Sequence, residues 1–182
     1  MTSKKDMRSL IEKRLSQNKQ MTGDVFFNLS TLTRKFDFDS MAGYWPIGFE
    51  IDVIAFLSHC NAIGIRCCLP YISEKTSLLV FKAWHPNDPL VRGKYNIPSP
   101  SGSAANIIPK VILVPLMAFD KKAHRLGRGG GFYDRTLEIL RRKLSIVSIG
   151  VAFDEQEVDS VPTEPHDQKL DYIVTPTRII TG

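Results

Sequence analysis

A glycine-rich loop that carries two arginines is the segment of this sequence best suited to chemistry. Residues 125–134 read RLGRGGGFYD, and the glycines of the loop are Gly127, Gly129, Gly130 and Gly131. Glycine allows a backbone to adopt positive φ and lets its amides approach a ligand closely. Arginine can bind phosphate oxygens through two parallel hydrogen bonds, which lysine cannot do. The loop therefore predicts an anion-binding site in which Arg125 and Arg128 are the candidate catalytic residues.

The elements expected around this loop favour the same interpretation. An apolar run at 111–114 predicts a buried strand before it, and a helix is expected at 131–143 directly after it. The unsatisfied N–H groups and positive dipole end of a helix N-terminus attract phosphate. The loop is not a Walker A motif, because no Lys-Ser or Lys-Thr pair closes it, and it lies too far from its strand for a dinucleotide fingerprint. The alternative is a merely flexible turn, which the two arginines make less favourable.

Two acidic positions are candidates for holding a divalent cation. Asp134 falls in the first turn of the expected helix, where it can stabilise the helix dipole, hold Mg²⁺ between phosphate oxygens, or do both. A second acidic loop contains Glu164, His166 and Asp167. Taken alone it is an ordinary polar loop, in which His166 is better explained as a surface cap than as a ligand or base. The loop becomes part of a site only if a parallel sheet brings it beside Asp134.

Length and composition indicate one domain over residues 1–182. The 182 residues are 43% hydrophobic and 24% charged, close to globular averages. No apolar run is long enough to span a membrane, and the charged start has no signal core, so we expect a cytoplasmic protein. Cys60, Cys67 and Cys68 are expected to be buried, reduced thiols, and a catalytic cysteine is discarded. The net charge of +5 is dispersed and suits a pocket for a polyanionic small molecule as well as an RNA groove.

Hydrophobic periodicity predicts alternating helices and strands. Helices are expected at 4–17, 22–34, 51–62 and 131–143, and strands at 41–45, 65–69, 77–83, 111–114, 146–152 and 172–174. Pro70 is expected to end the strand at 65–69. The segment 84–109 is rich in Pro, Gly, Ser and Asn, and such long connections tend to be functional. Short apolar strands that alternate with helices indicate a three-layer α/β/α single domain with a mainly parallel sheet.

These segments resemble a known family. The glycine-rich block, with VPLMAFD at 114–120 before it, is similar to the signature of 5-formyltetrahydrofolate cyclo-ligase, also called methenyltetrahydrofolate synthetase. Further similarity lies at Lys4–Arg8, at Glu50 and Asp52, at Gly64 and Pro70, and from Pro165 to Thr175. The resemblance spans nearly the whole chain, is most specific in the glycine-rich block and is weak between Thr22 and Tyr44. It implies an enzyme, an ATP-dependent cyclo-ligase.

The resemblance also implies roles for individual residues. ATP would be bound by Lys4, Lys5, Arg8, Arg125, Leu126, Gly127, Arg128, Gly129, Gly130, Gly131, Phe132 and Tyr133. The folate would contact Trp45, Glu50, Arg128, Gly129, Gly130, Gly131 and Phe132, with Asp52 as an alternative to Glu50. Mg²⁺ would be held by Asp134 and Asp167. Because Phe132 has no hydroxyl group, its role would be packing or stacking.

The reaction implied by the resemblance converts 5-formyltetrahydrofolate to 5,10-methenyltetrahydrofolate, with ATP and Mg²⁺ required and ADP and phosphate released. The γ-phosphoryl group of ATP would activate the formyl oxygen, N10 would attack the formyl carbon, and phosphate would leave. Such phosphoryl transfer asks a protein for positioning and charge stabilisation rather than for a nucleophile. The expected partners are these two small molecules, without nucleic acid or membrane, and the chain is expected to be a monomer.

Two other functions would use the same features. A non-catalytic nucleotide- or sugar-phosphate-binding module would need the loop and its arginines, but neither Asp134 nor Asp167 as a metal ligand. An RNA-binding domain would use the basic charge, including the run at 141–143, yet the sequence has no aromatic-rich recognition motif such as RNP1. Both rank below the ligase.

Overall fold

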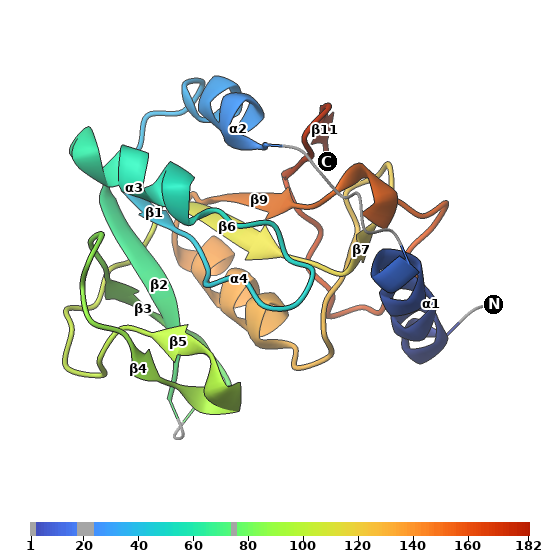
Figure 1. Cartoon of the computed structure of the whole chain (residues 1–182), viewed down its shortest axis with the longest axis horizontal. Helices are drawn as coiled ribbons and strands as arrows, with labels where there is room; N and C mark the ends of the chain where they lie inside the picture. Colours follow the sequence, from blue (N-terminus) through green and yellow to red (C-terminus); the bar gives the residue numbers. More distant parts are fainter. Residues whose placement is uncertain (1–2, 18–23, 74–75) are drawn as a thin grey trace.

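A mainly parallel sheet of seven strands forms the centre of the fold (Figure 1). The computed structural model describes residues 3–17, 24–73 and 76–182, and within them the strand order is β11-β10-β9-β6-β1-β2-β3. The strands are β1 (Ser40–Ala42), β2 (Arg66–Ile72), β3 (Leu79–Ala83), β6 (Val111–Pro115), β9 (Val147–Val151), β10 (Tyr172–Val174) and β11 (Ile179–Thr181). The pairs from β10 to β2 are parallel, whereas the edge strands β3 and β11 pair antiparallel.

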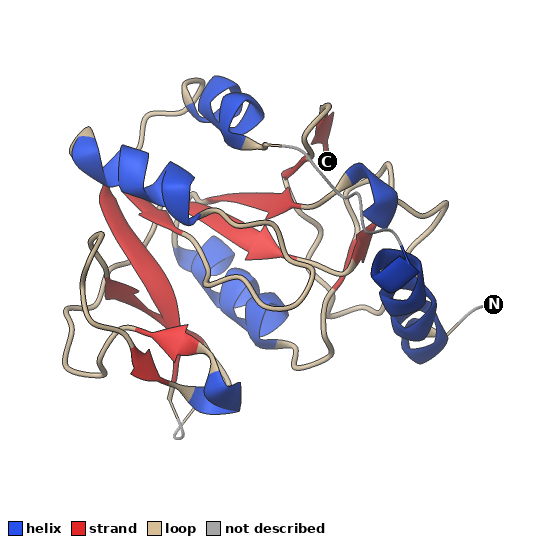
Figure 2. Cartoon of the chain, viewed as in Figure 1, coloured by secondary structure: helices blue, strands red, loops and turns tan. Residues whose placement is uncertain are grey.

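Helices cover both faces of this sheet. α2 (Phe26–Thr33) and α3 (Ile54–Ala62) pack into one hydrophobic core, and α4 (Phe132–Lys143) packs into a second. Figure 2 shows these helices in blue around the red strands. The prediction of a three-layer α/β fold with a mainly parallel sheet is therefore confirmed. None of the described helices is long and apolar enough to cross a membrane.

The strands contribute alternate residues to the two cores. Along β6, Val111 and Leu113 belong to the core that contains α2 and α3, whereas Ile112 and Val114 belong to the core that contains α4. All four side chains are at most 1% exposed. A parallel strand that is covered on both faces has no solvent side, which explains why this run is hydrophobic throughout rather than alternating with polar residues.

α1 (Lys4–Gln17) lies apart from both cores and packs near a short hairpin of β7 (Ala118–Phe119) and β8 (Arg125–Leu126). The apolar face of α1 and its partners form a third cluster made of Met7, Ile11, Leu15, Ala118, Leu126 and Val161. The three α1 residues follow the i, i+4, i+8 spacing of one helix face. The Arg14 guanidinium adds hydrogen bonds to the backbone carbonyls of Glu155 and Glu157. The whole-helix prediction for 4–17 is thus confirmed.

The predicted elements are found with shifted ends. The helix expected at 51–62 begins at Ile54, because the Asp52 carboxylate accepts the Ile54 N–H at 2.7 Å. The helix expected at 22–34 is observed as α2, and positions 22–23 of that prediction lie outside the described residues. The strand expected at 65–69 continues to Ile72, so the prediction that Pro70 ends it is wrong. β1 pairs with residues 66–68 of β2 and does not reach Pro70. The edge of β2 that faces β1 is therefore unpaired at Pro70, and a residue without an N–H is tolerated there.

The long segment 84–109 contains structure that the sequence did not predict. β4 (Val91–Arg92) and β5 (Pro98–Ser99) form a small antiparallel pair joined through η1 (Lys94–Asn96). Tyr95 and Asn96 in this turn have φ of 58° and 62°, a conformation that non-glycine residues seldom adopt. The pair lies beside the carboxyl end of β2, the end farther from α3 in Figure 1. A hairpin built from two-residue strands has too few positions to show any hydrophobic period.

Candidate active site

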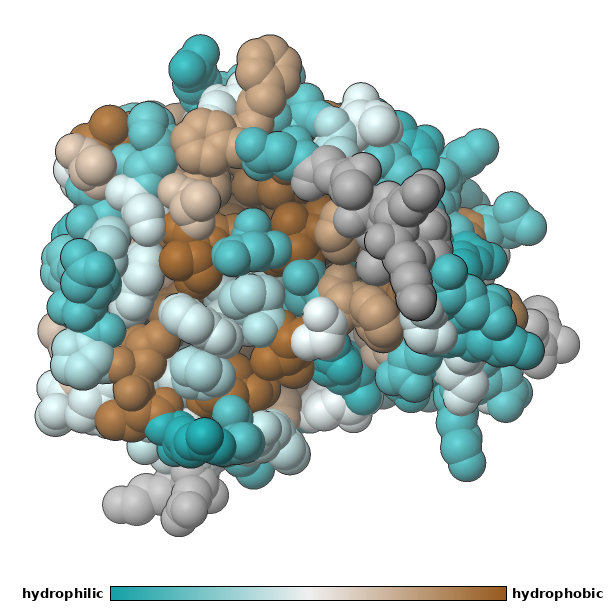
Figure 3. Space-filling view, viewed as in Figure 1, coloured by the Kyte–Doolittle hydropathy of each residue, from teal (hydrophilic) through white to brown (hydrophobic). Residues whose placement is uncertain are grey.

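A cleft of about 520 Å³ opens at the carboxyl ends of three neighbouring parallel strands. Tyr44 and Trp45 line it after β1, Ile72 ends β2, and Pro115 and Leu116 lie at the end of β6. The space-filling view in Figure 3 shows this face hollowed at its centre, with hydrophobic residues exposed around the hollow. Open α/β sheets place ligands at this edge, because the loops that follow the strands converge there.

The cleft brings together residues that are far apart in the sequence. The residues named from the sequence that line it are Lys4, Arg8, Trp45, Glu50, Arg125, Leu126, Gly127, Arg128, Gly129, Gly130, Gly131, Phe132, Tyr133, Asp134 and Asp167. Lys5 does not line it, because its side chain lies on the exposed side of α1. Asp52 does not line it either, since it caps the start of α3. Of the two alternatives Glu50 and Asp52, the geometry places Glu50 at the cleft.

The glycine-rich loop runs from β8 to the start of α4 and passes close to α1. Gly129 and Gly131 have φ of 101° and 64°, and Gly131 is the N-cap of α4. Arg8 donates from Nε to the carbonyl of Gly127 at 2.9 Å. A Cβ atom at Gly129 would lie 3.4 Å from the Arg8 guanidinium carbon. Such a contact is of ordinary van der Waals length, so glycine at 129 is required by its left-handed backbone rather than by the space beside Arg8.

Arg125 lines the cleft but is almost completely buried. Its side chain is 4% exposed, and Nη2 lies 2.7 Å from Oδ1 of Asp134. Its Nη1 donates to the carbonyl of Gln168, whose own N–H donates to Oδ1 of Asp134 at 3.0 Å. Its guanidinium is thus held by a carboxylate, the partner that a buried arginine needs, and its expected contact with phosphate stays a prediction. The pair joins β8, the first turn of α4 and the loop after Asp167.

Arg128 reaches across the cleft to the segment that follows β1. Nε donates to the Glu50 carboxylate at 2.9 Å, and Nη2 donates to the carbonyl of Ile47 at 2.8 Å. Arg128 is 44% exposed, whereas Glu50 is 8% exposed. Burial raises the pKa of the Glu50 carboxyl group, and hydrogen bonds from Arg128 and the Ile47 N–H offset only part of that increase. A buried acid is thus held by a cation that remains accessible to a ligand.

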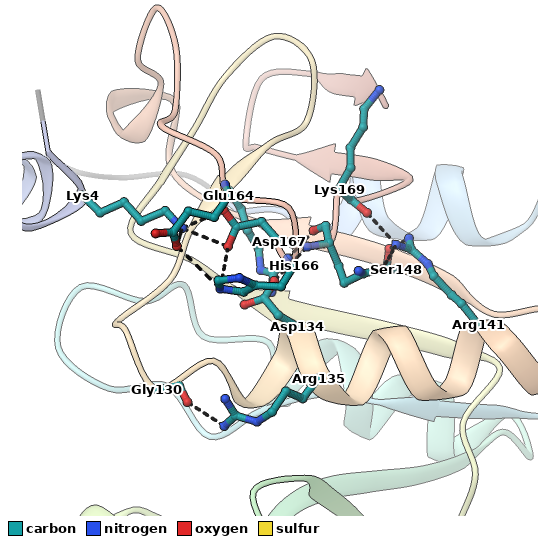
Figure 4. A network of polar contacts seen from close by, with 12 residues as sticks. Lys4, Gly130, Asp134, Arg135, Arg141, Ser148, Glu164, His166, Asp167 and Lys169 are labelled. Atoms are coloured by element: carbon teal, nitrogen blue, oxygen red, sulfur yellow. Dashed lines mark hydrogen bonds and ion pairs between the residues drawn. The ribbon is translucent and has the colours of Figure 1, made fainter. Parts of the chain in front are cut away.

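A cluster of charges from both ends of the chain lies at the α1 end of the cleft (Figure 4). The Lys4 ammonium lies 2.6 Å from Glu164 and 2.7 Å from Asp167, and His166 lies 3.5 Å from Glu164. Burial acts to raise the pKa of Asp167, but hydrogen bonds from Lys4 and the Glu164 N–H outweigh it, so the pKa of this carboxyl group is lowered. One ligand atom from each of Glu164, His166 and Asp167 lies within 4.8 Å of the others. Asp134 is outside this group, although Gln168 links it to the same loop.

Some residues of the cleft were not predicted. Lys94 and Tyr95 of η1 line it, and the Tyr95 ring lies 6.3 Å from the Phe132 ring in an edge-to-face arrangement. Tyr44 lies deeper, where its hydroxyl donates to the carbonyl of Ile51. The Tyr133 hydroxyl is buried and has no hydrogen-bond partner among the described residues. The only sequence signal for the η1 residues was the length of segment 84–109.

The three cysteines do not line the cleft. Cys60, Cys67 and Cys68 are buried free thiols, as predicted. Burial raises the pKa of Cys60 to about 11 and of Cys67 to about 12. A thiol that stays protonated at neutral pH is a poor nucleophile, and none of the three lines the cleft.

The sheet and its cleft define an α/β enzyme whose glycine-rich, arginine-bearing loop lies at the carboxyl edge of the strands. A model of the 5-formyltetrahydrofolate cyclo-ligase family matches residues 4–176. The chain belongs to this family and is a ligase.

Individual relatives agree with the family match. A 5-formyltetrahydrofolate cyclo-ligase of Haemophilus influenzae is 40% identical over 136 residues, which cover 72% of this chain and 72% of the relative. One from Mycolicibacterium smegmatis is 34% identical and covers 79% of this chain and 76% of its own length. The solved structure of 5,10-methenyltetrahydrofolate synthetase from Mycoplasma pneumoniae has a TM-score of 0.70 at 26% identity, over 94% of this chain and 98% of that one. The Aquifex aeolicus synthetase shares the fold, with a TM-score of 0.78 over 98% of this chain and 92% of that one.

Proposed function

We propose that this protein converts 5-formyltetrahydrofolate to 5,10-methenyltetrahydrofolate and that ATP and Mg²⁺ are required. The observation that carries the proposal is the cleft shared by Arg8, Arg128 and Glu50. It offers phosphate-binding groups and a buried acid, with apolar walls between them. The seven-stranded sheet that supports the cleft is continuous, which favours one domain for the whole reaction. The free, buried thiols favour a reducing, cytosolic compartment.

The ATP phosphates are proposed to lie over the glycine-rich loop and the start of α4. Arg8 is suited to a phosphate because, among the described residues, its guanidinium has no carboxylate partner and lies against Gly129. Lys4 is nearby and could transfer its hydrogen bonds from Asp167 and Glu164 to phosphate oxygens. Lys5 is supported less well, since it is exposed outside the cleft. The helix N-terminus contributes N–H groups and a positive dipole end.

The folate is proposed to lie against the walls between Trp45, Glu50 and Phe132. Glu50 can accept hydrogen bonds from the N–H groups of a pterin ring, and its burial makes such bonds strong. Trp45 and Phe132 present apolar rings on two sides of the cleft. Tyr95, at the rim, adds a third aromatic surface. A flat, polar-edged ring system fits this combination.

In the proposed reaction the formyl oxygen attacks the γ-phosphorus of ATP and ADP leaves. N10 then attacks the formyl carbon, the ring closes, and the oxygen departs as phosphate. Arg128 would stabilise the charge of the transferred phosphoryl group, because its guanidinium is the part of the loop that remains exposed to a ligand. Arg125 would act indirectly, by fixing Asp134 and the loop around it. No protein nucleophile is needed.

The acidic residues fit a magnesium ion in their chemistry. Carboxylate oxygens are the protein ligands that Mg²⁺ prefers, and Oδ2 of Asp134 has no hydrogen-bond partner among the described residues. Asp167 and Glu164 already hold a cation, the Lys4 ammonium, between them. Asp134 and Asp167 are therefore the residues proposed to hold Mg²⁺, which would neutralise charge on the phosphates when bound.

The test is a spectrophotometric assay of methenyl product from 5-formyltetrahydrofolate, with ATP and Mg²⁺ supplied or withheld. The ligase predicts product only when both are present, with ADP formed in equal amount. A non-catalytic nucleotide- or sugar-phosphate-binding module predicts nucleotide binding without product. Product formed at the same rate without ATP would remove the phosphoryl-transfer chemistry from the proposal.

A further inference from the structure

The basic run at 141–143 does not present its three charges to solvent in the same way. Arg142 and Lys143 are exposed at the end of α4, and Arg142 donates to Glu138 of the same helix. Arg141 is turned toward the fold, with 27% of its side chain exposed. The first residue of this run therefore has partners inside the protein rather than a charge that is free for an external polyanion.

One half of the Arg141 guanidinium binds the loop 168–171, which follows Asp167. Nη1 donates to the backbone carbonyl of Lys169 at 2.8 Å and lies 3.4 Å from Oε1 of Gln168. Figure 4 shows Lys169 beside Arg141 at one end of the polar network, with Asp167 at the other. A hydrogen bond to a backbone carbonyl restrains the path of the chain itself and not only the direction of a side chain.

The other half of the guanidinium is held by the central sheet. Nη2 donates to Oγ of Ser148 at 2.8 Å and lies 3.0 Å from Oδ2 of Asp171. Ser148 is completely buried in β9, and its N–H donates to the same Asp171 oxygen at 2.8 Å. Asp171 stands directly before β10. The guanidinium therefore has a rigid support on one side and the loop 168–171 on the other.

Asp134 binds the same loop from the same helix, two turns earlier. Its Oδ1 accepts the N–H of Gln168 at 3.0 Å. Asp134 and Arg141 share one face of α4, because their separation in the sequence is close to two turns, or about 10 Å along the helix axis. α4 therefore holds the loop at two points, and Asp167 directly precedes the first of them.

These two points bear on the distance between Asp134 and Asp167. The two carboxylates proposed to hold Mg²⁺ come from different elements, one from α4 and one from the chain just before the loop 168–171. Mg²⁺ is small and demands nearly ideal octahedral geometry, so it tolerates little error in the placement of its ligands. Residues that orient metal ligands without touching the metal typically change its affinity by about 10- to 100-fold.

From this geometry we infer that Arg141 is a positioning residue for the magnesium–nucleotide site, because it holds the loop 168–171 against α4 and so sets the distance between Asp134 and Asp167. The inference rests on the proposed function, which places ATP and Mg²⁺ at this end of the cleft. Arg141 does not line the cleft, so its effect on ligands must act through the loop. Its ion pair with Asp171 is partly exposed, and its contribution to stability is therefore small.

The experiment separates nucleotide binding from folate binding in Arg141→Ala. The Kd of Mn²⁺·ATP is measured without folate by water proton relaxation, and KM is measured for ATP and for 5-formyltetrahydrofolate. Arg141→Ala should raise the Kd of Mn²⁺·ATP and the KM for ATP by about tenfold and leave the KM for the folate unchanged. Arg141→Lys should show a smaller rise, because an ammonium can still donate to the carbonyl of Lys169. This variant keeps the charge and gives the same test if the alanine variant does not fold.

Arg142→Ala is the matched control, since it removes an exposed arginine from the next position of the same helix. It should leave both KM values and the Kd of Mn²⁺·ATP unchanged. Asp171→Ala removes the support of the guanidinium from the side of the sheet. The double variant Arg141→Ala/Asp171→Ala should therefore bind Mn²⁺·ATP no more weakly than the weaker of the two single variants.

Thermal unfolding of each variant shows whether a change is merely structural. A purely structural role would lower Tm and raise the KM values for ATP and the folate together, and that result would overturn the inference. Wild-type binding of Mn²⁺·ATP by Arg141→Ala would also overturn it. A wild type that neither binds Mn²⁺·ATP nor forms methenyl product would instead overturn the proposed function, and the inference with it.

Discussion

Arg125 and Asp134 form an ion pair at the start of α4, with the guanidinium 2.7 Å from the carboxylate and the arginine 4% exposed. Replacing Arg125 with methionine keeps the volume but leaves a carboxylate with one partner fewer in a poorly solvated place. We expect a loss of about 2–4 kcal/mol in the free energy of unfolding, measured by urea denaturation. Adding Asp134→Asn should restore part of the loss. If the double variant is less stable than Arg125→Met alone, the pair is not what holds the two elements together.

Arg128 is predicted to matter for turnover much more than for stability. Its guanidinium is 44% exposed and contacts the protein through Glu50 and the carbonyl of Ile47. Arg128→Ala should lower kcat/KM for methenyl formation by roughly 10²–10³ through loss of charge stabilisation. Arg128→Lys should recover little of it, because an ammonium cannot form the two parallel bonds. Arg142→Ala, which removes an exposed arginine paired with Glu138, is the control. Near-normal kcat/KM in Arg128→Ala would contradict the assigned role.

Asp134 is predicted to set the magnesium requirement. Asp134→Asn keeps an oxygen that can accept the Gln168 N–H but removes the charge that a divalent cation needs. The Mg²⁺ concentration for half-maximal activity should rise by about tenfold, which is the usual scale for disturbing a metal ligand or its support. Asp52→Asn, at the start of α3 and outside the cleft, should leave the titration unchanged. An unaltered titration in Asp134→Asn would exclude this residue from the metal site.

Glu50 should make the protein less stable as pH rises, relative to a variant that cannot ionise there. The pKa of Glu50 is raised above its ordinary value of 4.5, so the folded state favours the protonated form. Stability from this group is fully present below pH 4.5 and is lost as pH rises through the folded-state pKa. Glu50→Gln should therefore gain stability relative to the wild type across that interval. Arg128→Ala removes a cation that lowers the pKa, so it should move the interval to higher pH. A stability difference that is flat with pH would contradict the shift.

Two glycines of the loop should respond differently to alanine. Gly129 has φ of 101°, so a side chain there is strained by the left-handed backbone, although its Cβ atom would only touch the Arg8 guanidinium at 3.4 Å. A Cβ atom at Gly127 would meet open space, with no heavy atom of the described residues beyond its chain neighbours within 4 Å. Gly129→Ala should lower the free energy of unfolding by about 1–2 kcal/mol, the cost of a left-handed conformation for an alanine. Gly127→Ala should change the free energy of unfolding by only a few tenths of the loss expected for Gly129→Ala. Equal losses in thermal unfolding would mean that strain at 129 is relieved elsewhere.

The fold was predictable where apolar residues repeat over several positions. α1 and β10 were found with the predicted bounds, because Met7, Ile11 and Leu15 mark a helix face and 172–174 form a buried strand. β11 was missed because it is a partly exposed edge strand that pairs with β10, and the small pair β4–β5 was missed because two-residue strands cannot display a period. The prediction that Pro70 ends β2 was wrong because the strand can contain a proline where no neighbour needs its N–H. β1 is too short to pair with Pro70, and that is a property of the assembled sheet.

The site was predictable as a set of residues more than as a set of contacts. The glycine-rich motif and the family resemblance together named residues that meet in one cleft, with Lys5 as an exception. They did not reveal that Arg125 is buried against Asp134, because a sequence gives no distance between side chains nine positions apart. Nor did they identify Lys94 or Tyr95, which lie in a turn where Tyr95 and Asn96 have positive φ, a conformation that the sequence did not predict.

Lys4 and Asp167 are separated by 163 positions in the chain yet hydrogen-bond directly. During synthesis on the ribosome, α1 is made long before its partners Val161 and Asp167, so it cannot dock in full until they have emerged. The charged cluster at the α1 end of the cleft can therefore form only when both ends of the described chain are present, and a translation product that stops before Asp167 lacks it.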